Sequence, residues 1–98
     1  MTTTSQQQAS PAGSAAVPQV IASYAAYLQA RTRTIPQATV RGDHADLTLS
    51  IGTKALVVAF QLRQREWSLR SAELRHGERT ATFTRGQLAE AVTALLRP

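Results

Sequence analysis

The sequence predicts a two-layer α+β domain in which an antiparallel meander of four or five strands carries an N-terminal and a C-terminal helix on one face. Two observations predict it: a central segment with strand periodicity, and amphipathic helical patterns before and after that segment. In the centre, Leu56, Val58 and Phe60 recur at every second residue, with small apolar residues between them. This pattern is typical of a central strand that is covered on both faces.

The domain organisation follows from length and composition. The chain has 98 residues and no cysteine, which is enough for one small domain without disulfides. Residues 1–17 are rich in Thr, Ser, Gln and Ala, and this composition predicts a disordered polar tail before a single domain over 18–98. Because a core of this size provides little stability, self-association is favoured and we expect a homodimer.

The first element of the domain is a predicted helix. Pro18 suits the first helical position, and the pattern behind it indicates an amphipathic helix that ends at about Arg31. Its apolar residues at three- and four-residue spacing are Val20, Ile21, Tyr24, Tyr27 and Leu28. Ile35 precedes Pro36, which favours extended backbone from this point on.

Residues 38–51 predict strand structure, either as one long strand or as two short ones. Glycine and aspartate at 42 and 43 provide turn chemistry, so two strands joined as a hairpin are favoured, the first of them over 38–41. The Arg-Gly-Asp triplet there is read as part of this turn, since we expect no secretory signal. Gly52 and Gly77 predict two further turns of the meander.

In the fourth predicted strand, from Trp67 to about Leu74, the apolar residues do not all fall on one face of the sheet. Strict alternation places Trp67 and Leu69 on one face and Ala72 and Leu74 on the other. A β-bulge near Arg70 and Ser71 would bring all four residues to the same face. We therefore predict a bulge at this position, followed by a short edge strand over 80–83.

The start of the last helix has the clearest local signal. Thr84 and Gln87 have the spacing of a capping box, while Phe83 and Leu88 have the spacing of a hydrophobic staple. The sequence therefore predicts a helix that begins directly after Thr84. Its predicted apolar stripe consists of Leu88, Val92, Leu95 and Leu96, with Ala89 and Ala91 beside it.

The charge balance favours a negatively charged partner. Eleven Lys and Arg stand against six Asp and Glu, the formal net charge is +5, and a single one of the eleven cations is a lysine. Arginine pairs bidentately with phosphate or carboxylate, so nucleic acid or an acidic protein is the expected partner. The alternative is that the arginine excess reflects coding composition and has no role in binding.

Two surfaces are candidate sites. If residues 38–41 form a separate strand, a meander brings five cations to one end of the sheet, where they would bind nucleic acid or another anion: Arg31, Arg33, Lys54, Arg75 and Arg79. The sheet face turned away from the helices would expose Val57, Ala59 and Gln61, which form the candidate dimer or partner face. We expect no aromatic ring on that face, so base stacking of RNA is not predicted there.

No residue set predicts catalysis. His44 and His76 lie on expected turns, the carboxylates are scattered, and no Gly-rich phosphate loop or nucleophile motif is visible, so we expect neither an enzyme nor a cofactor. Asp43, His44 and Asp46 contain metal-ligand atoms, but consecutive polar residues at a turn are typical of a solvated loop, and we predict no metal.

The function predicted from sequence is that of a small basic, non-enzymatic binding protein that contacts nucleic acid or another polyanion through its arginines. The alternative is a protein adaptor or regulatory protein that acts as a homodimer through the sheet face. The longest apolar run, 55–60, is too short to span a bilayer. With no membrane association and no secretory signal expected, a cytoplasmic location is predicted.

Overall fold

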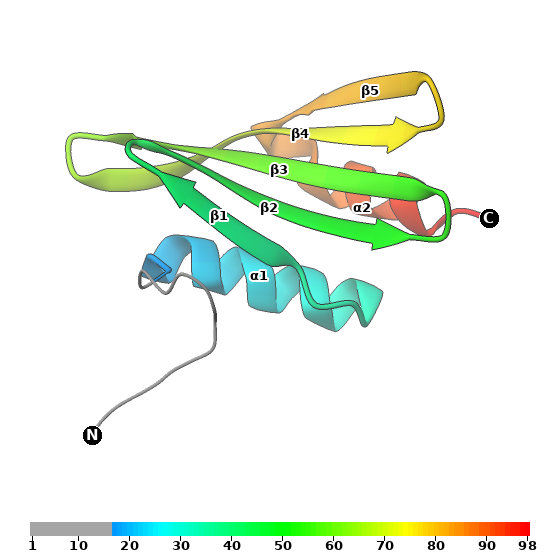
Figure 1. Cartoon of the computed structure of the whole chain (residues 1–98), viewed down its shortest axis with the longest axis horizontal. Coiled ribbons are helices and arrows are strands. Elements are labelled where there is room, and N and C mark those ends of the chain that lie inside the picture. The colour runs from blue at the N-terminus through cyan, green and yellow to red at the C-terminus, as the bar shows by residue number, and fades with distance from the viewer. Residues whose placement is uncertain (1–16) are drawn as a thin grey trace.

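The computed structural model describes residues 17–98 and contains a helix, a five-stranded antiparallel sheet and a second helix, in that order (Figure 1). The predicted tail, residues 1–17, lies outside the described residues except for Val17. The elements are α1 (Gln19–Thr32), β1 (Gln37–Arg41), β2 (His44–Ile51), β3 (Lys54–Arg63), β4 (Glu66–His76), β5 (Arg79–Thr84), the 3₁₀ turn η1 (Arg85–Gln87) and α2 (Leu88–Leu96). The predicted α+β fold is confirmed.

The sheet is a simple meander with strand order β1-β2-β3-β4-β5. Residues 38–51 form two strands, as favoured, and β1 begins one residue earlier than predicted, at Gln37. Gly42, Gly52 and Gly77 have positive φ angles of 60°, 60° and 65° in the turns β1–β2, β2–β3 and β4–β5. In each of these two-residue turns the second residue has no positive φ, which is the pattern of a type II′ turn with glycine at its first position.

The predicted bulge in β4 is confirmed at Arg70. Phe60 pairs with Leu69 and Ala59 pairs with Ser71, so Arg70 has no partner of its own on β3. The extra residue shifts the alternation by one position. As a result, Trp67 and Leu69 before the bulge face the same side of the sheet as Ala72 and Leu74 after it.

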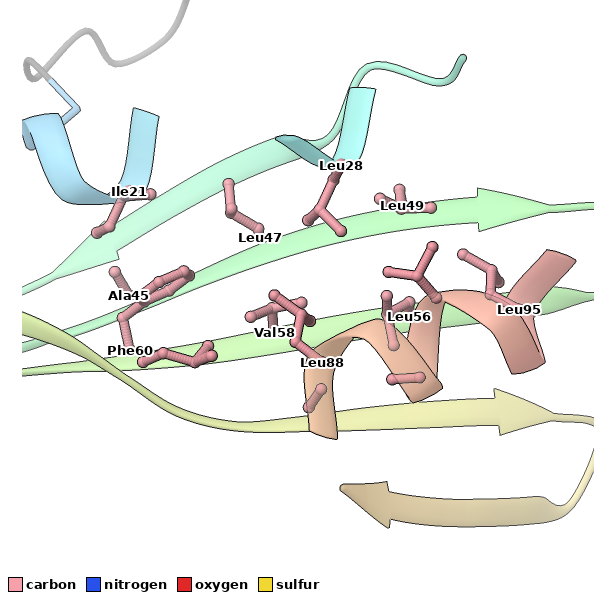
Figure 2. Packing of buried hydrophobic residues seen from close by; sticks show 14 residues of the cluster. Ile21, Leu28, Ala45, Leu47, Leu49, Leu56, Val58, Phe60, Leu88 and Leu95 are labelled. Atoms are coloured by element: carbon pink, nitrogen blue, oxygen red, sulfur yellow. The ribbon is translucent and has the colours of Figure 1, made fainter. Parts of the chain in front are cut away.

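The core lies between one face of the sheet and both helices. Figure 2 shows Ile21 and Leu28 of α1 and Leu88 and Leu95 of α2 pointing at the same sheet face. Burying a leucine or isoleucine of this kind contributes about 1.5 to 3 kcal/mol relative to leaving it exposed. The buried apolar residues are Ile21, Leu28, Ala45, Leu47, Leu49, Leu56, Val58, Phe60, Leu69, Ala72, Leu88, Ala91, Val92 and Leu95.

The ends of α1 differ from the prediction by one residue. Pro18 is the residue before the helix, with ψ at 148°, and its carbonyl accepts the first bond from the Ala22 N–H at 2.9 Å. At the other end, the backbone of Arg33 is left-handed (φ 58°), and its N–H donates to the Gln29 carbonyl at 2.7 Å. The hydroxyl of Thr32 donates to the Leu28 carbonyl at 2.7 Å, so this buried polar group has a partner.

The second helix begins with the predicted capping box. The N–H of Thr84 donates to Oε1 of Gln87 at 3.0 Å, and the Thr84 hydroxyl donates to the same oxygen at 3.2 Å. The first turn is the 3₁₀ turn η1, and the α-helix follows at Leu88. The predicted stripe needs one correction: Ala91 is fully buried, whereas Leu96 is 44% exposed, because the helix turns position 96 past the edge of the core.

Candidate functional site

The five cations of the predicted anion site lie at one end of the sheet, which we call the basic end (Arg31, Arg33, Lys54, Arg75 and Arg79). The β2–β3 and β4–β5 turns are at this end, and the C-terminus of α1 reaches it below β1 (Figure 1). Arg79 lies on the edge strand β5, whereas Arg31 and Arg33 lie at the end of α1 on the far side. The basic end therefore extends from the edge strand β5 to the end of α1.

Lys54 differs from the other members of the basic end because it contacts the protein itself. Its Nζ donates to the carbonyl oxygens of Ala94 and Arg97, at the C-terminus of α2. The Ala94 carbonyl also accepts the N–H of Arg97 at 3.3 Å, and the last carbonyls of a helix carry the negative end of its dipole. Lys54 therefore stabilises the last turn of α2, a role that sequence spacing did not indicate.

Among the arginines of the basic end, Arg75 has an acidic partner. Its Nε lies 2.6 Å from Oε1 of Glu73, on the outer face of the sheet. Arg31 lies over the ring of Tyr27, with Cζ 5.8 Å from the ring centre. Arg31, Arg33 and Arg79 are exposed and have no carboxylate within ion-pair distance in the described chain. These three guanidinium groups are the available donors of the basic end.

The outer face of the sheet, opposite the core, is covered by no element of residues 17–98. Val57, Ala59 and Gln61 lie on it along β3, and all three are partly buried by their neighbours on β2 and β4. Thr48 and Glu73 flank Val57 on the two neighbouring strands. The centre of the face around Val57 is thus narrow and apolar, with hydroxyl, carboxylate and arginine side chains around it.

The aromatic residues of the described chain lie away from this outer face. Phe60, Trp67 and Phe83 belong to the core or pack against it from the inner face. Tyr24 packs on Phe60, with ring centres 5.4 Å apart and planes inclined at 57°. Because Tyr24 and Tyr27 are both in α1 and pack against the core, the outer face offers no ring on which a base could stack.

A hollow of about 580 Å³ lies on the outer face next to the bulge of β4. We call it the arginine hollow, because Arg63, Arg70 and Arg85 line it. Serine and threonine hydroxyls of β4 and β5 also line it, together with Gln61, Leu69 and Phe83, and the described residues around it include no carboxylate. Arg70 joins this site through the bulge of β4 and Arg85 through the exit of β5.

The polar turn residues considered as metal ligands do not converge. Nε2 of His44 lies 3.3 Å from Oδ1 of Asp43, and Asp46 lies 3.9 Å from Arg41 Nη2. Between residues 17 and 98, no group of three or more His, Asp or Glu side chains is placed to hold a metal ion. These residues form paired surface contacts around the β1–β2 turn.

Neither helix of the described part of the chain has the length and hydrophobicity that a membrane span requires. Comparisons with protein-family models, with curated proteins and with solved structures found no significant match. Function is therefore inferred from the chain's own residues.

Proposed function

We propose that this protein is a small, non-enzymatic binding protein that contacts a polyanion, in the first place the phosphate backbone of a nucleic acid, through the basic end. One observation carries the proposal. All ten arginines are exposed, and eight of the ten have no carboxylate within ion-pair distance among the described residues, since Arg41 and Arg75 alone have acidic partners. Guanidinium groups in this state keep their donors available for phosphate oxygens.

The rest of the surface favours contacts to phosphate groups over contacts to bases. The outer face has no exposed aromatic ring for stacking. The side chains that a recognition helix would use to read base edges are scarce, because α1 contains one arginine, two glutamines and no asparagine. We therefore expect affinity that tolerates changes of nucleic-acid sequence and falls steeply with salt.

The test is a fluorescence-anisotropy titration of single- and double-stranded DNA and RNA at several salt concentrations. Arg33→Gln combined with Arg79→Gln removes two charges from the basic end without adding bulk. This variant should bind every sequence more weakly by a similar factor, and the slope of log K against log salt should fall by about 2 in magnitude.

The matched control is Arg41→Gln combined with Arg65→Gln, which removes two charges from the opposite end of the sheet and should keep the wild-type slope. Equal losses in both variants would mean that net charge alone drives binding. Absence of binding to any nucleic acid at low salt would contradict the proposal and leave the arginine excess as a feature of composition.

A second candidate function is that of an adaptor or regulatory protein that forms a homodimer through the outer sheet face. The observation that favours it is the position of Val57 and Ala59 at the centre of a face that no described element covers. Two copies of such a face could pack around a two-fold axis, with the surrounding hydroxyl groups at the rim.

A further inference from the structure

Part of β4 has an unpaired edge. This strand has 11 residues and β5 has six, and β5 pairs with β4 over Ser71–His76. At Thr84 the chain leaves the sheet for η1, so no strand of the described chain pairs with Glu66–Arg70 on the side away from β3. Backbone N–H and C=O groups that point to this side have no ladder partner, and such an edge is a template for another strand.

The arginine hollow lies beside this unpaired edge, on the outer face. Arg63 comes from the end of β3, Arg70 from the bulge, and Arg85 from the first residue after β5. Ser68, Ser71 and Thr84 add hydroxyl groups to the same lining. Glu66 is the one acidic residue on the unpaired edge, and it pairs in register with Arg63. The positive charge therefore predominates where a further strand would lie.

The inner side of the same edge is apolar. Trp67 is partly buried and packs against the core, next to the buried Leu69 on the same strand. Phe83, near the end of β5, is also partly buried against the core. A strand added beside Glu66–Arg70 would therefore have an apolar surface on one side and arginines on the other.

We propose that the unpaired edge of β4 and the arginine hollow form one docking site for an extended protein segment that alternates carboxylate and apolar residues. The backbone of the segment pairs with Glu66–Arg70, in the manner of β-strand addition. Its carboxylates reach Arg70 and Arg85 on the outer face, and its apolar residues extend the core beside Trp67. A nucleic-acid strand would use the arginines but would leave both the backbone edge and the apolar side without partners.

This site uses different arginines from the basic end and does not depend on nucleic-acid binding. Trp67 is the single tryptophan of the chain, so its fluorescence reports directly on the proposed edge. The probe is a short acetylated peptide that alternates glutamate and valine, titrated into the full chain. We expect saturable binding with a blue shift of the Trp67 emission as the added strand covers the indole ring.

Three controls test the contribution of charge and the location of the site. The same peptide with glutamine in place of glutamate should bind about fivefold to tenfold more weakly. The original peptide should bind the double variant Arg70→Ala with Arg85→Ala more weakly by a similar factor, provided that circular dichroism shows an unchanged fold. Arg31→Ala combined with Arg33→Ala, which removes the same charge at the basic end, should bind the peptide like the wild type.

A peptide with N-methylated valines, which lacks the N–H donors for strand pairing, should lose binding. If this peptide binds as well as the parent, the site is an anion hollow without strand addition and the proposal is wrong. The proposal is also wrong if the glutamate peptide does not bind, or if the two double-arginine variants lose the same amount of peptide affinity. None of these results depends on whether the protein binds nucleic acid.

Discussion

Two residues in the β3–β4 turn have a backbone conformation that is unfavourable for their residue types. Gln64 and Arg65 have φ angles of 50° and 67°, and two consecutive residues of positive φ between antiparallel strands form a type I′ turn. Asn-Gly is the usual choice at these positions, because a side chain with a Cβ meets the carbonyl oxygen in left-handed backbone. Neither position has glycine, asparagine or aspartate, so the residue types did not indicate this turn.

Arg65→Gly should therefore stabilise the protein. The substitution removes the left-handed strain at one position and adds some chain entropy to the unfolded state, for a net gain of about 0.5 to 1 kcal/mol. Chemical denaturation monitored by circular dichroism measures the difference.

The comparison for Arg65→Gly is Gly77→Ala, which adds a Cβ at the positive-φ position of the type II′ turn between β4 and β5. A methyl group at Gly77 would meet no atom within 4 Å, so its effect reports on the backbone alone. This variant should lose about 1 kcal/mol. If Arg65→Gly is also destabilising, the Arg65 side chain contributes more than the strain costs.

At the scale of the element, α2 is held at both of its ends by contacts outside its own ladder. Thr84 and Gln87 cap the beginning, and Lys54 of β3 binds the carbonyls at the end. A helix of nine residues is too short to be stable by itself in water. Capping and the burial of one face against the sheet are therefore what keep it folded.

Thr84→Ala should destabilise the protein by about 1 kcal/mol, because it removes the capping hydroxyl. In a domain of this size the loss corresponds to a shift of several degrees in the thermal midpoint. Thr84→Ser is the matched control, since serine keeps the hydroxyl and should retain most of the stability. Equal losses in both variants would attribute the effect to the strand preference of threonine at the end of β5, and not to the cap.

At the scale of the whole molecule, the two sheet faces have different roles. Both helices pack on the inner face, while the outer face and the unpaired edge of β4 are left to solvent or to a partner. A core of this size provides limited stability, and covering the outer face would add to it. This arrangement is the physical basis for expecting a homodimer.

Val57→Arg should shift the protein toward a monomer, because it places a long charged side chain at the centre of the proposed contact. Size-exclusion chromatography with light scattering measures the mass of both proteins at several concentrations. Ala89→Arg, on the exposed side of α2, is the control and should leave the mass unchanged. A monomeric wild type at high concentration would end the dimer hypothesis.

Local patterns predicted those features of the fold that depend on neighbouring residues. The alternation through Leu56 and Phe60 marked the central strand, and the change of face between Leu69 and Ala72 located the bulge to within one residue. Glycines at positions of positive φ marked three of the four turns. The candidate cations of the basic end were found in this way too, since a meander determines which turns share an end.

The sequence by itself determined the order of the elements, the core face of the central strands and the start of α2, because period, turn chemistry and capping act over a few residues. Tertiary structure alone decided what the charged side chains contact. Lys54 binds the end of α2, some forty residues away in the chain, and Arg63, Arg70 and Arg85 meet in one hollow. Such contacts join residues that are far apart in the chain, so they depend on how the strands and α2 pack together and not on a pattern of neighbouring residues.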